Sequence, residues 1–353
     1  MGRKLIKIFS FIVFGTAAVL GLFLAYMIVT DYRPPAELNV DMENNQELVL
    51  ERGVPFSLTT FNIGYCGLDK NQDFFMDGGT MSRSSSREQT LVNLSGILEF
   101  LQRENSDFLL LQEIDIKSSR SYDINQYEAI QGAFGDYGSL FALNYLVKWV
   151  PVPVMRPMGY VKSGIGLFSR YKIDSSRRYQ LPGSEAWPRQ LFDLDRCMTK
   201  SVIPVEDGNK LVLVNLHLSA YDKGGRVREQ QLKFLKEYIQ QNYEKGYYVI
   251  IGGDWNHLLA PDRLEEPGVN ENWPEWLVML PEDFTPQGFQ WVVDESVKTV
   301  RDNKTRYIEG ETFTAIIDGF LVSPNIEILD VHGHDLGFEH SDHNPVTCVL
   351  RLK

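Results

Sequence analysis

The sequence contains few cysteines, and their number and spacing do not support a disulfide framework. Cys66, Cys197 and Cys348 are an odd number at wide intervals, and no two of them form a paired metal-binding or redox motif. Cys348 lies in an apolar stretch typical of a strand, so we expect a buried thiol there. No cysteine lies beside the apolar N-terminal segment, which disfavours a lipoprotein anchor.

The chain also lacks an excess of positive charge. It has 35 Lys and Arg residues against 47 Asp and Glu residues, for a formal net charge of −12. Tight binding to nucleic acid of any sequence depends on Lys and Arg side chains that release counterions, so the charge disfavours that activity without forbidding it. Repeats and low-complexity blocks are missing too. The length and apolar content are typical of one large globular domain or two ordinary ones.

One long apolar run is present at the N-terminus. Arg3, Lys4 and Lys7 precede residues 8–30, which carry no charge, and about 20 apolar residues suffice for a membrane-spanning helix. We therefore expect a cytoplasmic tail at 1–7 and a single transmembrane anchor at 8–30; a cleaved signal peptide is the alternative. Because basic flanks stay on the cytoplasmic side, the main domain should lie outside the cytoplasm at the cell membrane.

The segment after the anchor reads as a linker, because residues 31–50 are polar, contain two adjacent prolines and show no apolar period. A single domain is expected over 51–353. Apolar runs predict strands, and amphipathic spacing predicts helices. Strands are expected at 56–63, 108–113, 165–169, 198–205, 210–218, 247–254, 313–321 and 326–331, and helices at 87–102 and 226–242.

Two aromatic and proline-rich stretches show no clear period. Residues 137–162 are expected to form a loop that faces substrate or covers the surface, and insertion into a bilayer is a further alternative. Residues 260–311 are also expected to be loop-like. Their tryptophans could line a substrate cleft or pack within the insertion.

Polar residues follow the ends of several expected strands. Strand ends in layered α/β folds meet at one rim, so residues distant in sequence can come together there. Oxygen atoms of Asn, Asp and Glu suit Mg²⁺ or Mn²⁺, and imidazoles can transfer protons. This combination indicates metal-assisted phosphoester hydrolysis. The residues are Asn62, Glu113, His217, Asp254, Asn256, Asp318, Asp342 and His343.

Seven motifs occur in the order and rough spacing of the endonuclease/exonuclease/phosphatase superfamily, the fold of deoxyribonuclease I, which residues 54–353 resemble. Each motif alone is unspecific, but seven in order are not. The resemblance implies an α/β (α+β) fold, a four-layer sandwich of two packed mixed β-sheets flanked by helices. The motifs are Thr60-Phe61-Asn62-Ile63, Leu111-Gln112-Glu113, Gly164-Ile165-Gly166-Leu167-Phe168-Ser169-Arg170, Asn215-Leu216-His217-Leu218, Gly252-Gly253-Asp254-Trp255-Asn256, Ile317-Asp318-Gly319-Phe320 and Ser341-Asp342-His343-Asn344-Pro345.

The resemblance implies a metal-binding group. Glu113 would be the principal ligand of the cation, with Asn62 close to the ion and the phosphate. Asp342 would be an additional metal ligand or a water-orienting carboxylate. The sequence itself supports a function for Glu113, because it follows an apolar run and burying an unpaired carboxylate costs several kcal/mol.

It also implies a catalytic group. Asp254 would orient or deprotonate the attacking water, and Asn256 would hold a phosphate oxygen. His343 would polarise the phosphate or assist proton transfer, with Asp318 fixing its tautomer. His217 resembles the second histidine of the nuclease and sphingomyelinase branches.

Two arginines are candidates for substrate binding. Arg120 and Arg301 could contact phosphate, although solvated surface charges are the alternative. Gly64 stands where base-excision nucleases carry an acidic residue, which disfavours that branch. The stretch 217–221 is weakly similar to the corresponding stretch of neutral sphingomyelinases.

These observations predict a membrane-anchored, monomeric phosphodiesterase that depends on Mg²⁺ or Mn²⁺ and acts on a phospholipid or a small phosphodiester outside the cytoplasm. An extracytoplasmic nuclease and an inositol or sugar phosphate phosphatase are alternatives. A catalytically inactive anchored binding module is a third, although such a module would not require the whole catalytic set.

Overall fold

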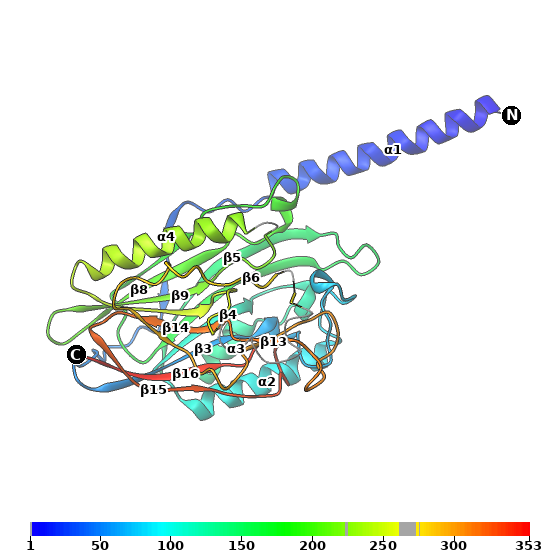
Figure 1. Cartoon of the computed structure of the whole chain (residues 1–353). Coiled ribbons are helices and arrows are strands. Elements are labelled where there is room, and N and C mark those ends of the chain that lie inside the picture. Colours follow the sequence, from blue (N-terminus) through cyan, green and yellow to red (C-terminus); the bar gives the residue numbers. More distant parts are fainter. Residues whose placement is uncertain (1, 223–224, 261–272, 275) are drawn as a thin grey trace.

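The computed structural model describes residues 2–222, 225–260, 273–274 and 276–353. The described chain contains two seven-stranded mixed β-sheets that pack face to face (Figure 1). The first sheet has the strand order β1 (Glu37–Asn39), β7 (Ser175–Gln180), β8 (Cys197–Pro204), β9 (Lys210–His217), β10 (Tyr248–Asp254), β14 (Asp318–Val322) and β11 (Gln290–Val292). The second has the order β15 (Ile326–Gly333), β16 (Val346–Leu352), β3 (Pro55–Asn62), β4 (Phe108–Asp115), β6 (Gly159–Ser169), β5 (Gly138–Val150) and β2 (Met42–Glu43).

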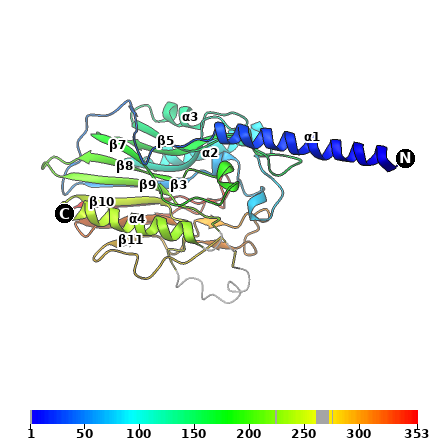
Figure 2. The same cartoon turned by 90° about the horizontal axis from the view of Figure 1, so that it is seen from above.

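Helices cover the outer faces of both sheets. Helix α4 (Arg226–Tyr243) packs on the first sheet, while α2 (Arg87–Glu104) and α3 (Gln126–Ala133) pack on the second, on the opposite side of the molecule (Figure 2). The apolar core between the sheets includes Leu58 and Leu110 from one sheet and Leu213, Ile250 and Phe320 from the other. The expected four-layer α/β sandwich is confirmed.

Local sequence explains where α2 begins and ends. The Ser86 side chain accepts a hydrogen bond from the Gln89 amide at the N-terminus, and Asn105 adopts a left-handed conformation with φ of 54° at the C-terminus. Leu94, Ile97 and Leu101 are buried, as their spacing along one helical face predicts. The helices expected at 87–102 and 226–242 are both present, within two residues at each end.

The expectation of a loop at 137–162 is wrong, because this stretch contains all of β5 and the start of β6. The two strands form a long antiparallel hairpin with register shifts between Leu143 and Tyr145 and between Val147 and Val150. Such bulges interrupt the alternation of buried and exposed side chains. The sequence therefore lacked the two-residue period by which a strand is recognised.

The segment 31–50 is more ordered than the expected linker. Strand β1 pairs with β7 at the edge of the first sheet, and β2 pairs with β5 at the edge of the second. Asn45 exchanges hydrogen bonds with the backbone of Ile173, and Leu50 is buried. Short strands on sheet edges are largely exposed and need no apolar alternation, so residues 31–50 contain no pattern that predicts a strand.

The stretch 260–311 lies partly outside the described residues, at 261–272 and 275. Its described part contains β11 and β12 (Val300–Arg301), and β12 pairs with β13 (Thr314–Ala315). Trp291 packs against the buried Trp255 with ring centroids 4.7 Å apart. Trp276 packs in a small apolar cluster and also lines the main cavity, so the tryptophans serve both of the expected purposes.

Helix α1 (Gly2–Val29) projects from the sandwich (Figures 1 and 2). Residues Arg3–Val29 have a mean hydropathy of 2.4 over the most apolar window, long and apolar enough to cross a membrane. Only the end nearest the domain contacts it: Met27 is buried beside Tyr145 and Val150, and Phe23 stacks on Phe192 at 6.1 Å.

Candidate active site

Four strands deliver polar side chains to one rim of the sandwich. Strand β3 ends at Asn62, β9 at His217 and β10 at Asp254, and β3–β4 and β9–β10 are parallel pairs whose carboxyl ends point the same way. Asp318 begins β14 directly opposite Asp254. The last loop joins them where His343 forms a backbone bridge with Val300. Residues up to 281 positions apart thus share one site.

His343 lies between two buried carboxylates. Its Nδ1 is 2.8 Å from Asp318 Oδ2, and its Nε2 is 3.8 Å from Asp254 Oδ2. Burial alone would lower the pKa of His343, but the charges of Asp318 and Asp254 outweigh it and raise the pKa to about 10. Burial raises the pKa of Asp254 to about 7, against the opposing effect of His343. The arrangement favours a protonated imidazole beside a carboxylate that can exchange a proton near neutral pH.

Asn62 connects this pair to Glu113. Its Nδ2 lies 3.0 Å from Asp254 Oδ2 and 3.5 Å from Glu113 Oε1. Its Oδ1 accepts the Gly64 amide at 3.1 Å. The amide nitrogen therefore faces the acids, and Asn62 holds the two carboxylates at a fixed separation. Its direct ligation of a metal stays a prediction.

The backbone aims Glu113 out of its strand. A β-bulge interrupts the pairing of β4 with β6 between Leu111 and Ile114, and Glu113 adopts a left-handed conformation with φ of 55°. Residues other than glycine seldom adopt this backbone conformation, because it costs of order 1–3 kcal/mol. Where it occurs, it is often at a functional site. Burial raises the pKa of Glu113; Arg120 opposes the shift and the charge of Asp342 adds to it.

Arg120 lies beside Glu113 and is itself held by several contacts. Its guanidinium binds Asp115 at 3.0 Å, lies 3.8 Å from Glu113 Oε2 and stacks over the Tyr65 ring at 3.9 Å. A guanidinium held on three sides has little freedom to follow a substrate. The geometry favours a positioning role, and the predicted phosphate contact is not tested by it.

Arg301 is wholly buried, and its side chain binds the backbone of a loop. Its Nη2 donates to the carbonyl oxygens of Leu68, Asp69 and Gln72 at 3.3, 2.8 and 3.0 Å. The side chain thus fastens the loop after β3 to β12. These hydrogen bonds favour a structural role. The predicted phosphate contact stays a prediction, because Arg301 also lines the cavity and its buried Nε has no hydrogen-bond partner in the described part of the chain.

Asp342 faces the cavity from the last loop. Asn303 donates to its Oδ2 at 2.7 Å, and Ser341 Oγ lies 3.4 Å from its Oδ1. Ser341 also donates to the Asn62 carbonyl at 2.8 Å. The loop carrying Asp342 and His343 is therefore attached to the end of β3.

Asn256 and His217 flank Asp254. Asn256 adopts φ of 48°, its amide donates to Asp254 Oδ1 at 2.9 Å, and its Nδ2 donates to the Leu218 carbonyl at 2.8 Å. His217 Nε2 lies 3.3 Å from Asp254 Oδ2. Burial lowers the pKa of His217, and the charge of Arg196 lowers it further, which favours a neutral imidazole.

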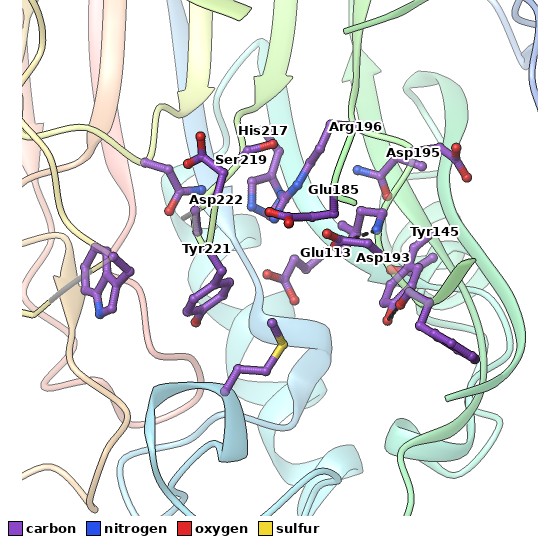
Figure 3. A pocket seen from close by; sticks show the side chains of 18 of the residues that line it. Glu113, Tyr145, Glu185, Asp193, Asp195, Arg196, His217, Ser219, Tyr221 and Asp222 are labelled. Atoms are coloured by element: carbon purple, nitrogen blue, oxygen red, sulfur yellow. Dashed lines mark hydrogen bonds between the residues drawn. The ribbon is translucent and has the colours of Figure 1, made fainter. Parts of the chain in front are cut away.

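All of the predicted site residues except Asp318 line one cavity of about 670 Å³. Figure 3 shows Arg196 and His217 side by side above Glu113, with Tyr145 and Tyr221 on either side. The Nη1 atom of Arg196 is buried and has no hydrogen-bond partner within the described part of the chain. It is the kind of donor an anionic ligand would complete.

Sequence reasoning missed Arg196, Tyr145 and Tyr221. Arg196 directly precedes β8 and so lies at the start of its strand, whereas the predicted site residues follow the ends of strands. The only signal was a run of charge, Asp193-Leu194-Asp195-Arg196, before an apolar strand. Tyr221 donates to Asp77 at 2.7 Å and joins two loops of the cavity wall.

Comparison with known proteins gives the same fold. The Endonuclease/Exonuclease/phosphatase family model matches residues 59–343. No curated protein sequence matches the chain at a significant level.

Solved structures with this architecture share little sequence with the chain. An endonuclease/exonuclease/phosphatase from Beutenbergia cavernae has a TM-score of 0.58 at 14% identity, covering 84% of this chain and 72% of the other. ANGEL2, a 2',3'-cyclic phosphatase solved with adenosine-2',3'-vanadate, has a TM-score of 0.54 at 15% identity, covering 89% and 99%. The catalytic domain of human Nocturnin, solved with bound sulfate, has a TM-score of 0.52 at 16% identity, covering 89% and 98%. With a family model matched over most of its length, this chain belongs to the Endonuclease/Exonuclease/phosphatase family.

Proposed function

We propose that this protein is a membrane-anchored, divalent-metal-dependent phosphodiesterase. One observation carries the proposal: the His343 imidazole, bound to Asp318, faces Asp254 in the cavity that also holds Glu113 and Asp342. A binding module would not need a histidine held between two buried carboxylates, since such an arrangement is costly to fold.

The donor set fits a hard divalent cation. Glu113 and Asp342 both face the cavity, and each raises the local negative charge that a cation would neutralise. Together with Asn62 they would hold Mg²⁺ or Mn²⁺. When bound, the cation would neutralise phosphate oxygens and stabilise the charge added in the transition state.

The chain's own residues supply the proton transfers. Asp254 Oδ2 accepts a hydrogen bond from Asn62 Nδ2 and lies 3.3 Å from His217 Nε2, and in its ionised form Asp254 can accept a proton from an attacking water. Protonated His343 presents Nε2–H toward the same space and can donate to a phosphate oxygen. Each such group contributes about 10²–10⁴-fold. Asn256 and Arg196 border the space a phosphate would occupy.

The cavity favours a lipid or another small phosphodiester as substrate. Besides the predicted catalytic residues, its wall includes Leu68, Phe74 and Phe75. It also includes Asp31 and Arg33, which follow the C-terminal end of α1. An apolar wall suits acyl chains or another apolar substituent. The basic residues before the span support a location of the catalytic domain outside the cytoplasm.

A substrate panel tests the class of reaction. The detergent-solubilised full chain with Mg²⁺ is assayed on sphingomyelin and a glycerophospholipid in mixed micelles, bis-p-nitrophenyl phosphate, plasmid DNA and an inositol phosphate. Turnover of the lipid or the small diester is expected. Preferred cleavage of DNA would make the protein a nuclease, preferred cleavage of the monoester a phosphatase, and turnover of none a binding module.

A further inference from the structure

The hairpin between β5 and β6 ends in an exposed apolar tip. We define the tip as residues 149–157, Trp-Val-Pro-Val-Pro-Val-Met-Arg-Pro. Val154 is 83% exposed and Met155 is 95% exposed, with Trp149 and Val152 each at 42%. Exposed single apolar residues are ordinary, but several large ones along one short tip indicate an interaction surface.

Charge separates this hairpin from the rest of the chain. No Asp or Glu occurs between Asp136 and Asp174, whereas Lys148 directly precedes the tip and Arg156 lies within it. The whole chain has a net charge of −12. Tryptophan beside Lys and Arg is typical of segments at the level of lipid headgroups, where the rings are half buried and the cations meet phosphate.

The tip lies beside α1. Met27 and Phe23 of α1 pack in one apolar cluster with Tyr145, Val147 and Val150, the last of which lies at the base of the tip. Both views show the hairpin projecting from the domain on the side toward which α1 extends (Figures 1 and 2). A membrane that contained α1 would therefore come close to the tip.

A second exposed tryptophan lies on the neighbouring segment. Trp187 is 60% exposed and precedes the short helix η4 (Arg189–Phe192). Phe192 of this helix stacks on Phe23 of α1, and its carbonyl accepts a hydrogen bond from Tyr145. The segments that carry Trp149 and Trp187 thus both contact the C-terminal end of α1.

We propose that the β5–β6 tip enters the headgroup region of the bilayer leaflet on the catalytic side, as a second membrane contact beside α1. The occupant is lipid, because the surface is continuous with a candidate span and combines tryptophan with the basic residues Lys148 and Arg156. The inference rests on the membrane location in the proposed function and is independent of the reaction.

Two contacts would orient the domain on the membrane, where one helix alone leaves it free to tilt. The cavity is lined by Val150, Pro151 and Val152 at the base of the tip and by Tyr32 and Arg33 after α1. Its opening would then lie at headgroup level. A phosphoester of a lipid could reach Glu113 while its apolar part stayed near the bilayer.

Site-specific fluorescence tests the contact without using activity. Cys66, Cys197 and Cys348 are buried, so an introduced surface cysteine can be labelled selectively with an environment-sensitive dye. Met155→Cys reports the tip, and Phe14→Cys reports the middle of α1. Glu206→Cys is the matched control, because the exposed β8–β9 turn lies at the end of the sheet opposite His217.

The full-length variants are reconstituted in vesicles containing anionic lipid and isolated by flotation, and lipids with nitroxide at a shallow or a deep position serve as quenchers. We expect the dye at 155 to shift to the blue and to lose about half of its emission to the shallow quencher, while the dye at 206 shows neither change. Equal signals at 155 and 206 with quenching at 14 would overturn the proposal. A blue shift at 155 without lipid quenching would also overturn it, because protein would then cover the tip.

Discussion

Replacing Asp318 by Asn removes the charge that faces His343 while keeping the size of the side chain. Two unit charges about 4 Å apart interact by about 4 kcal/mol at an effective dielectric constant of about 20, equal to about three pKa units. The pKa of His343, which stands at about 10, should therefore fall to about 7 in the variant. The protonated imidazole would then be lost over the mildly alkaline range.

The expected loss of activity depends on pH. At pH 9 only about 1% of His343 would stay protonated in Asp318→Asn, so kcat/KM should fall about 100-fold, whereas at pH 6.5 the loss should be small. The assay is a pH profile of bis-p-nitrophenyl phosphate hydrolysis with saturating Mg²⁺. Asp330→Asn, an exposed position on β15, is the control. An alkaline limb that does not move in Asp318→Asn, with thermal unfolding unchanged, would refute the reasoning.

Three further substitutions test separate parts of the site. Glu113→Gln removes a partly buried carboxylate whose pKa is raised by burial, so that its charged form is disfavoured in the folded protein. The melting temperature of this variant in EDTA should rise by about 2 °C, while its activity should fall at least about 100-fold. If Mg²⁺ stabilises the variant as much as it stabilises the wild type, Glu113 is not a metal ligand. Arg196→Gln should raise KM about 10- to 100-fold through loss of a charge-assisted hydrogen bond, with partial recovery in Arg196→Lys, and an unchanged KM would remove it from substrate binding. Arg301→Gln leaves backbone carbonyls without donors and should lower the free energy of unfolding by about 3 kcal/mol in chemical denaturation. Loss of substrate affinity without loss of stability would instead favour the predicted contact between Arg301 and phosphate.

The strand ends could be predicted because their signals are local. Glu113 and Asp254 each follow an uninterrupted apolar run, and a buried strand that ends in a carboxylate has few purely structural explanations. The parallel pairing of β3 with β4 and of β9 with β10 then brings these ends to one rim. The meeting of these residues at one rim could thus be inferred without coordinates, while their catalytic roles stay predictions.

The missed features depend on contacts that the sequence does not encode locally. Nothing in the residue type distinguishes the guanidinium of Arg301, whose Nη2 binds three carbonyl oxygens, from that of Arg196, whose buried Nη1 has no hydrogen-bond partner among the described residues. Strand β5 was missed because bulges break its period, and β1 because an edge strand needs no buried face. Each depends on a partner strand or loop far along the chain.

The most direct measurement is the rate of bis-p-nitrophenyl phosphate hydrolysis by the purified full-length chain as Mg²⁺ is added back after EDTA treatment. The His343→Ala variant is measured in parallel. The account predicts no turnover in EDTA, saturable recovery with Mg²⁺ in the wild type, and a rate lower by about 10²–10⁴-fold in the variant. Turnover that persists in EDTA, or a variant as active as the wild type, would contradict it.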